Sequence, residues 1–246
     1  MINLQNINVS FRKGNTKSIF GKERQQVLKD VSMNVEEGDC VGIIGESGSG
    51  KSTLGCVICG LLKPDSGKVY VKKPISVVFQ DYSTSVDPRF TVNDIIIESL
   101  TVRERRDGIK LNKDNEVYRL LELVGLGQEY ILRYPHELSG GQLQRICIAR
   151  AVALQPRIIL FDEAISSLDA HTQVQVMDLL RQIKLKYSLT YVFITHDLTS
   201  VTYLCNKVLF LYNGQVVETC NIDGLRTIKN EYAKNLLNSI MDVPVK

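Results

Sequence analysis

The segment GESGSGKS, residues 45–52, constrains this chain more than any other feature. It fits the pattern G-x-x-x-x-G-K-[ST] and lies between an apolar run at residues 40–44 and a stretch with helical spacing. Glycines let the backbone curl so that its N–H groups point at phosphate oxygens, and the following helix N-terminus adds positive charge. The pattern predicts a strand, a phosphate-binding loop and a helix. Lys51 would then reach the β- and γ-phosphates, and the Ser52 hydroxyl would bind Mg²⁺.

Composition limits the class of protein. Of the 246 residues, 44% are apolar and 23% are charged, which is typical of a folded domain and excludes a disordered chain. Uncharged runs stay below the roughly 18 residues of a membrane-spanning helix. The first residues, MINLQNINVSF, lack the pattern of a signal peptide, so we expect a cytosolic protein. A net charge of +3 is too small to indicate nucleic acid as a partner.

Six cysteines are scattered through apolar segments, which in a reducing compartment predicts small buried side chains. Cys56 and Cys59 have the spacing of a zinc-binding pair. They lie in an apolar helical run, however, and no second Cys or His pair accompanies them in the sequence. We therefore predict no structural zinc site.

Apolar periodicity predicts an α/β fold. Alternation at residues 2–4, 7–11 and 31–35 indicates an N-terminal antiparallel sheet. The connection at residues 12–26 carries five basic residues and one acidic residue. It indicates a solvated hairpin loop, with a phosphate- or partner-binding loop as the alternative. Continuous apolar runs suit strands of a largely parallel central sheet covered on both faces, and they occur at residues 40–44, 77–79, 158–161, 191–194 and 208–211.

Strand signals give way to helical spacing between residues 79 and 158, most clearly at residues 92–100 and 117–124. This change predicts a helical insertion into the α/β core. Residues 231–241 have the apolar spacing of a closing amphipathic helix. The sequence contains no sustained heptads and no internal repeat.

The segment RIILFDE, residues 157–163, is an apolar strand that ends in two carboxylates. Ligands of α/β sheets bind at the carboxyl ends of strands. Asp162 is suited to hold Mg²⁺ through water, and Glu163 is suited to orient and deprotonate the water that attacks a γ-phosphate. Taken alone, the segment also fits a solvated acidic pair.

The segment LSGGQ, residues 138–142, precedes a helical run at residues 143–154. A serine hydroxyl, glycine amides and a helix N-terminus predict a second phosphate-binding surface in a chain that already has one. We infer that this surface completes the nucleotide site of another subunit, so that ATP lies between two chains.

These segments, in this order and spacing, resemble the ATP-binding cassette (ABC) ATPases over nearly the whole chain. The resemblance implies a P-loop NTPase fold, with ATP and Mg²⁺ as cofactors, in one nucleotide-binding domain over residues 1–246. Residues 1–79 and 156–246 would form the α/β core with its β subdomain, and residues 80–155 the Q-loop, helical subdomain and signature helix. The residues implied to bind the nucleotide are Phe11, Gly45, Glu46, Ser47, Gly48, Ser49, Gly50, Lys51, Ser52, Thr53, Ser139, Gly140, Gly141, Gln142 and Asp169. Those implied in hydrolysis are Glu163, His196 and Gln80, with Ser52, Gln80 and Asp162 as Mg²⁺ ligands.

Four of these roles come from the resemblance alone. Phe11 corresponds to the aromatic residue that stacks on adenine, and Gln80 to the glutamine that links Mg²⁺ and water to the helical subdomain. His196 corresponds to the histidine that contacts the γ-phosphate, and Asp169 to an aspartate in the segment that crosses between subunits. From the residues themselves, Phe11 also fits a core position, Gln80 a turn and His196 a strand end.

Finer features resemble the ATPases of oligopeptide, dipeptide and nickel importers, a branch that includes metal-chelate importers. They are FQD at 79–81 with DPR at 87–89, YPHE at 134–137 and EYAKNLL at 231–237. This implies a second, different ATPase subunit, two transmembrane permease subunits, an external substrate-binding protein and a peripheral location on the cytoplasmic face of the cell membrane. Ala164 and Ile165 replace the usual Pro-Thr, which we expect to soften the turn after Glu163. The loop at residues 81–87 is also not the commonest version, and the tail lacks the cysteine-rich extension of some relatives.

The resemblance predicts ATP hydrolysis coupled to uptake of a peptide, nickel or a metal chelate, with a permease helix bound near residues 82–102. A soluble ABC-type ATPase acting on DNA or ribosomes is the alternative. The sequence has neither the long coiled coils nor the second cassette of those proteins. A kinase or GTPase of another P-loop family would not need residues 138–142.

Overall fold

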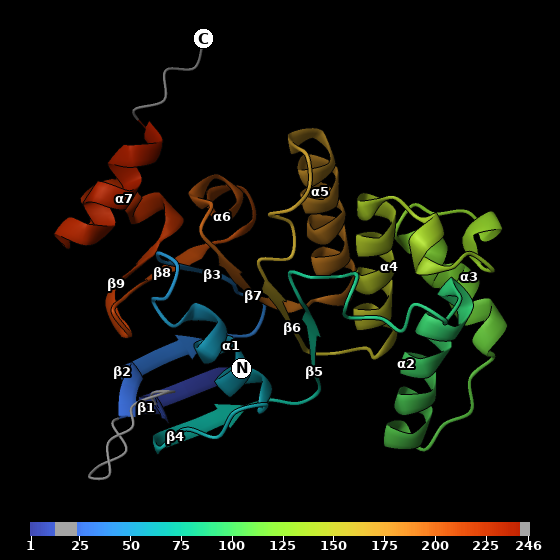
Figure 1. Cartoon of the computed structure of the whole chain (residues 1–246), viewed down its shortest axis with the longest axis horizontal. Helices are drawn as coiled ribbons and strands as arrows, with labels where there is room; N and C mark the ends of the chain where they lie inside the picture. The colour runs from blue at the N-terminus through green and yellow to red at the C-terminus, as the bar shows by residue number, and fades with distance from the viewer. Residues whose placement is uncertain (13–23, 242–246) are drawn as a thin grey trace, which may run out of the picture. The chain divides into compact units, whose positions relative to one another are not determined.

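The computed structural model describes residues 1–12 and 24–241 (Figure 1). The chain divides into two compact units, Met1–Lys72 with Val192–Lys246, and Lys73–Tyr191. This division differs from the predicted one. Two strands and a long helix that were predicted to belong to the α/β core lie in the same unit as the helical segment. The assignment of one nucleotide-binding domain stays a prediction.

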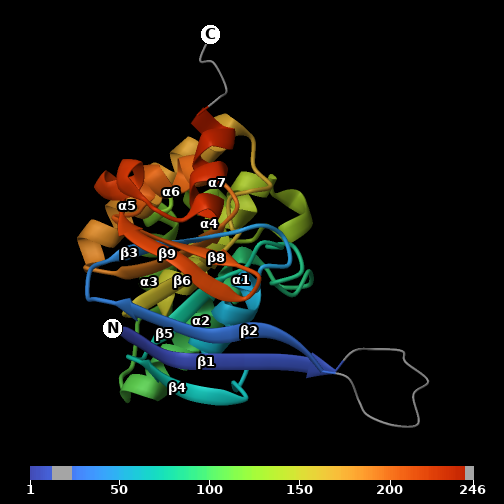
Figure 2. The ribbon, with the colours of Figure 1, turned by 90° about the vertical axis from the view of Figure 1, so that its left-hand side faces the viewer.

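The first unit contains the predicted antiparallel sheet, which has three strands (Figure 2). Its strands are β1 (Ile2–Arg12), β2 (Arg24–Val35) and β4 (Ser66–Val71), in the order β2-β1-β4. The alternations at residues 2–4 and 7–11 belong to one strand, β1. The register of its pairing shifts between the two stretches, where Asn6 has φ of 54°. Most of the basic connection, residues 13–23, lies outside the described residues.

The strand and helix predicted around the glycine-rich loop are β3 (Cys40–Ile44) and α1 (Lys51–Cys59). β3 is buried along its whole length and pairs in parallel with β8 (Lys207–Tyr212). β8 in turn pairs antiparallel with β9 (Gln215–Asn221). The remaining elements of this unit are α6 (Leu198–Leu204), the 3₁₀ segment η3 (Ile222–Thr227) and α7 (Glu231–Met241). β7 (Thr190–Thr195) crosses the boundary between the units.

The second unit contains the predicted helical insertion. Its elements are β5 (Ile75–Val78), α2 (Val92–Asp107), α3 (Lys113–Leu123), η1 (Gln128–Tyr130), η2 (Pro135–Glu137), α4 (Gly140–Ala153), β6 (Ile158–Asp162) and α5 (Ala170–Tyr187). α4 is buried on most of its surface and packs against α2, α3, α5 and β5 (Figure 1). β5 and β6 pair in parallel. Four helices of this unit have side-chain N-caps, with Thr91, Asn112, Ser139 and Asp169 each accepting a hydrogen bond from a backbone N–H of the first turn.

The cysteines follow the predicted burial in part. Cys40, Cys147 and Cys205 are buried, whereas the other three are half-buried. No group of three or more metal-binding side chains occurs in the part of the chain that the structure describes. Within the same residues, no helix combines the length and the apolar character that crossing a membrane requires.

Candidate functional site

Two glycines shape the phosphate-binding loop of the first unit. Gly45 approaches β8 so closely that a Cβ atom would lie 2.2 Å from the backbone oxygen of Leu211 and 2.7 Å from Ser49 Oγ. Gly50 precedes α1 with φ of 104°, a conformation that residues with a Cβ atom rarely adopt. The loop therefore requires glycine at both positions.

Lys51 begins α1 and is 94% buried, since only 6% of its surface is exposed. Its ammonium group donates to the carbonyl oxygens of Gly45 at 2.7 Å and Glu46 at 2.9 Å. The positive charge is thereby held over the loop. Ser52 is exposed beside it and Thr53 is half-buried. A cation, a hydroxyl and the N-terminus of α1 together form the set of groups that binds a nucleotide's phosphates.

Two further predicted residues of this unit lie at strand ends. Phe11 is 43% exposed near the end of β1, which excludes the core position that the sequence left open and leaves its ring accessible for stacking. His196 is exposed directly after β7. The next residue, Asp197, caps α6 by accepting hydrogen bonds from the N–H groups of Thr199 and Ser200. The histidine is therefore held between the end of a strand and a capped helix.

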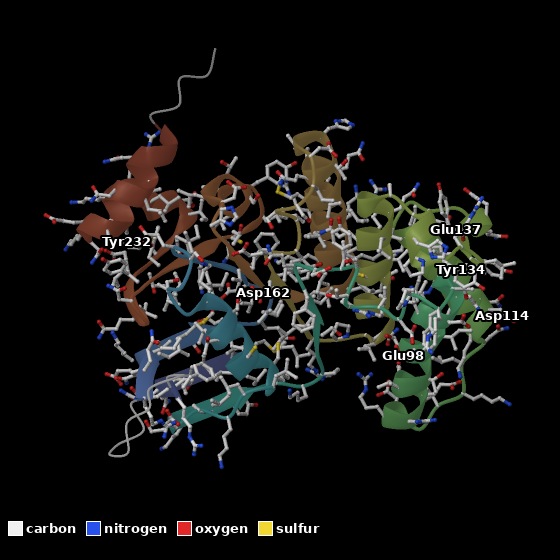
Figure 3. All side chains as sticks on the ribbon, in the orientation of Figure 1. Glu98, Asp114, Tyr134, Glu137, Asp162 and Tyr232 are labelled. Carbon is white, nitrogen blue, oxygen red and sulfur yellow. The ribbon has the colours of Figure 1, made fainter. Side chains whose placement is uncertain are left out.

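In the second unit, β6 delivers the two predicted carboxylates at its C-terminal end; Figure 3 labels the first, Asp162. The strand is buried up to Phe161, whereas Asp162 and Glu163 are half-buried. Glu163 has φ of 47°, a left-handed conformation that costs a non-glycine residue about 1–2 kcal/mol. Backbone strain of this kind concentrates at functional sites, because surrounding structure must maintain it.

Two glutamines hold the turn after Glu163. Gln144 of α4 donates its side-chain N–H to the carbonyl oxygen of Ala164, and Gln173 of α5 donates to that of Ile165 at 3.0 Å. Ala164 and Ile165 are both buried. Contacts from two helices thus fix this turn, in which Ala164 stands where related ATPases usually have proline.

Gln80 is exposed shortly after β5, and the next residue organises the chain that follows. One carboxylate oxygen of Asp81 accepts hydrogen bonds from the Ser83 hydroxyl at 2.6 Å and from the N–H groups of Ser83 and Thr84 at 3.1 Å. The Ser83 hydroxyl, followed by Thr84, lowers the pKa of Asp81. Gln80 therefore lies at a defined turn where the chain leaves β5 for the helical segment, and its linking role stays a prediction.

Ser139 is the N-cap of α4 and forms a capping box with Gln142. Ser139 Oγ accepts from the Gln142 N–H at 3.3 Å, and Gln142 Oε1 accepts from the Ser139 N–H at 2.9 Å. The side-chain amide of Gln142 also donates to the hydroxyl of Tyr130 at 3.0 Å. The capping box thus fixes the conformation of Ser139, and Tyr130 in turn holds the side chain of Gln142.

A cavity of about 720 Å³ opens beside this helix N-terminus, within the second unit. Gly140 and Gly141 line it, and Cβ atoms on them would lie 2.6 Å from the Tyr82 hydroxyl and 2.7 Å from the Thr172 methyl group. Asp169 lines the same cavity and accepts from the Thr172 N–H at 3.0 Å and hydroxyl at 2.7 Å. The Thr172 hydroxyl lowers the pKa of Asp169. Five predicted residues meet here: Ser139, Gly140, Gly141, Gln142 and Asp169.

The segment at residues 134–137 leads into this site through η2 (Figure 3). The Glu137 carboxylate accepts from the Tyr134 N–H at 2.8 Å, which lowers the pKa of Glu137. The ring of Tyr134 stacks on that of His136 with centroids 5.7 Å apart. These local contacts give the chain a fixed conformation before it reaches Ser139.

Sequence reasoning missed two tyrosines that contact the predicted segments. Tyr130 binds Gln142, and the hydroxyl of Tyr232 accepts from the Glu46 N–H at 3.0 Å. Neither contact has a periodic or motif signal, because each joins segments by tertiary packing. The resemblance of residues 231–237 to importer ATPases was the one pointer to Tyr232.

Comparison with known proteins agrees with the geometry of these segments. Residues 28–166 match the family model described as ABC transporter. The metal-staphylopine import system ATP-binding protein CntF of Staphylococcus aureus is 38% identical over 248 residues, which cover 96% of this chain and 98% of that protein. The oligopeptide transport ATP-binding protein OppF of Streptococcus mutans is 35% identical, over 98% of this chain and 81% of that protein.

A solved structure shares the fold. The dimeric structure of the ATP-binding cassette MJ0796, in a post-hydrolysis state bound to ADP and Pi, matches with a TM-score of 0.79 and 29% sequence identity. The match covers 90% of this chain and 99% of that chain. It confirms the expected cassette fold, with mostly parallel strands and an antiparallel N-terminal sheet.

Proposed function

Because this chain belongs to the ABC transporter family, we propose that it is the ATP-hydrolysing motor subunit of a membrane importer for a peptide, nickel or a metal chelate. The chain is an ATP-binding ATPase of that family. The relative named for metal-staphylopine import supports an importer, the relative named for oligopeptide transport supports a peptide as cargo, and nickel rests on the branch resemblance.

The cavity beside Ser139 carries this proposal. It presents a helix N-terminus and glycine amides within the second unit, while the first unit has a complete phosphate-binding loop of its own. One chain thus offers two phosphate-binding surfaces. We propose that its Lys51 loop serves one ATP and its Ser139 surface serves the ATP of a second ATPase subunit. The dimeric cassette with bound ADP and Pi supports such a partner, and the branch resemblance favours a different polypeptide.

Residues suited to Mg²⁺ are present in both units. The exposed Ser52 hydroxyl and the half-buried Asp162 carboxylate are oxygen ligands, which Mg²⁺ prefers. Phosphate oxygens and water would complete the coordination, because Mg²⁺ usually binds through one or two carboxylates together with substrate phosphates and keeps several waters. When bound, Mg²⁺ would neutralise charge on the phosphates.

The chain's own residues bind the nucleotide and hydrolyse it. Phe11 stacks on the base, while Lys51 and the N–H groups of the loop bind the phosphates. The Glu163 carboxylate accepts a proton from the attacking water, whose oxygen then bonds to the γ-phosphorus as the bond to ADP breaks. His196 and Gln80 contact the γ-phosphate and the water.

We also propose that the permease binds at residues 82–102. A groove of about 600 Å³ in this stretch is lined by residues 84–90 with Ile95, Glu98 and Arg150. Phe90 is 37% exposed and Val102 is 51% exposed, so apolar surface is available to an incoming helix. A cytoplasmic permease helix in this groove would place the chain on the cytoplasmic face of the membrane.

Crosslinking tests the docking site. Cysteine substitutions at Phe90 and Val102 are expected to crosslink to the permease, with a yield that changes when ATP is added. An exposed position on α7, Lys234, provides the control. Crosslinks at Lys234 with none at Phe90 or Val102 would place the docking face elsewhere.

Uptake by the assembled transporter tests the function itself. In membrane vesicles with the binding protein, ATP should drive uptake, and Lys51→Ala should abolish both uptake and ATP hydrolysis. Lys63→Ala, at an exposed lysine, should leave both unchanged. The comparisons do not favour the alternative of an ATPase that acts on DNA or ribosomes, because these relatives are named for transport. ATP turnover stimulated by DNA or ribosomes and not by a permease would support that alternative.

A further inference from the structure

The C-terminal helix contacts the phosphate-binding loop of its own chain. Tyr232 is the second residue of α7, where Figure 3 labels it. Its hydroxyl oxygen accepts a hydrogen bond from the backbone N–H of Glu46 at 3.0 Å, across 186 positions of sequence. Glu46 is the second residue of the glycine-rich loop. A segment outside the nucleotide motifs therefore contacts the loop backbone.

The ring of Tyr232 is fixed by its neighbours. It packs on the ring of Tyr212, the last residue of β8, with centroids 4.2 Å apart and planes at 31°. The backbone N–H of Tyr232 donates to Asn230 Oδ1 at 3.0 Å. Glu218 of β9 accepts from the N–H groups of Lys229 and Asn230 at 3.1 and 3.0 Å. Strands β8 and β9 thus determine where the hydroxyl lies.

Glu46 is bound through both of its backbone groups. Its carbonyl oxygen accepts from Lys51 Nζ at 2.9 Å and from the Ser49 N–H at 3.2 Å, while its N–H donates to Tyr232. On the other side of the loop, the Gly214 N–H donates to the Ser49 carbonyl oxygen at 3.0 Å. Tyr232 therefore helps to orient Glu46, and Glu46 together with Gly45 holds the Lys51 ammonium.

We propose that Tyr232 is a positioning residue for ATP binding, which holds Glu46 so that Lys51 and the loop amides are arranged for the phosphates before ATP arrives. This inference rests on the proposed function of the loop. A loop already in its binding conformation loses less conformational entropy when ligand binds. Removing the hydroxyl should therefore weaken binding of ATP even though Tyr232 is not assigned a contact with the nucleotide.

Two matched substitutions test the proposal in the full-length chain. Tyr232→Phe removes the hydroxyl and keeps the ring, whereas Tyr212→Phe removes a hydroxyl from the other member of the ring pair. One hydrogen bond typically corresponds to about a two- to tenfold change in an equilibrium constant. We expect Tyr232→Phe to raise the Kd for a fluorescent ATP analogue by about that factor, and Tyr212→Phe to leave it unchanged.

Amide hydrogen exchange gives a readout that does not depend on nucleotide. Exchange of the Glu46 amide, followed by NMR without ATP, should be faster in Tyr232→Phe than in the wild type or Tyr212→Phe. If only the ring of Tyr232 mattered, for its packing on Tyr212, both variants would keep that packing, and both the Kd and the Glu46 exchange rate would stay at their wild-type values. Unchanged Kd in Tyr232→Phe would overturn the proposal, as would unchanged Glu46 exchange.

A second substitution keeps the test decisive if Tyr232→Phe fails to fold. Glu218→Ala removes the acceptor that holds the start of α7 and leaves both tyrosines in place, and it should weaken ATP binding in the same direction. Wild-type affinity in that variant would then contradict the proposal. Failure of the proposed function is distinguishable, because the wild-type chain would then bind no ATP analogue while its Glu46 amide remained protected.

Discussion

Replacing Gly45 with alanine tests how far ATP binding depends on the fit of the loop against β8. The new Cβ would lie 2.2 Å from the Leu211 backbone oxygen, whereas ordinary contacts lie at 3.4–4 Å. The loop must therefore move by roughly 1 Å, because β8 is held by its pairing with β3 and β9. Overpacking of this kind costs about 1–3 kcal/mol of unfolding free energy.

The displacement should also disrupt the hydrogen bonds from Lys51 to the Gly45 and Glu46 carbonyl oxygens. We expect at least about a tenfold loss of ATP affinity, equivalent to about 1.4 kcal/mol. Urea unfolding and titration with a fluorescent ATP analogue measure the two effects separately.

Gly38→Ala provides the matched control for this experiment. Gly38 has φ of 82° and no heavy atom within 4 Å of a built Cβ, so the substitution strains the backbone without a steric overlap. It should cost about 1–2 kcal/mol of stability and leave ATP affinity unchanged, because Gly38 lies before β3 rather than in the loop. Wild-type affinity in Gly45→Ala would refute the reasoning, as would an equal loss in both variants.

Three further results are expected. Glu163→Gln should bind ATP with wild-type affinity in the assembled transporter and show no steady-state hydrolysis; near-wild-type turnover would remove Glu163 from its role. Burial raises the pKa of Asp39, but hydrogen bonds from Lys207 and Asn206 lower it overall. The stabilisation is complete above the ordinary pKa of about 3.9 and is lost as pH falls through the lower folded-state pKa. Asp39→Asn should therefore make the unfolding free energy fall less steeply as pH is lowered in this range. A dependence on pH as steep as in the wild type would contradict this. Tyr130→Phe should lower turnover by the assembled transporter several-fold without weakening ATP binding by the isolated chain, since Tyr130 holds Gln142 at the surface that we propose to serve the partner's ATP; weakened binding by the isolated chain would be inconsistent with that assignment.

Elements with strong local signals could be predicted closely from the sequence. The buried strand β3 has a continuous apolar run between polar residues, and α7 has regular apolar spacing, so both were predicted with their observed limits. Strands β4 and β9 were missed. β4 lies at the edge of its sheet with most residues exposed, and β9 is only partly buried, so neither carries the apolar pattern that marks a strand.

The candidate site shows the same limit. The glycine-rich loop and the Ser139 cap are continuous motifs, because their chemistry needs adjacent residues at fixed spacing. The supporting contacts are not continuous. Gln144 reaches Ala164 across 20 positions and Tyr232 reaches Glu46 across 186, so no local pattern could reveal either contact.

The dependence of ATP turnover on assembly tests the central claim. That claim is that the Ser139 surface of a facing subunit completes each ATP-binding site. The measurement is the hydrolysis rate per chain, with the oligomeric state determined by light scattering in the same samples, for the dilute isolated chain and for the complex with its second ATPase and permease. We expect the monomeric chain to bind ATP but to turn it over slowly, and the rate to rise on assembly. A demonstrably monomeric chain that hydrolyses ATP at the rate of the intact complex would contradict the shared site.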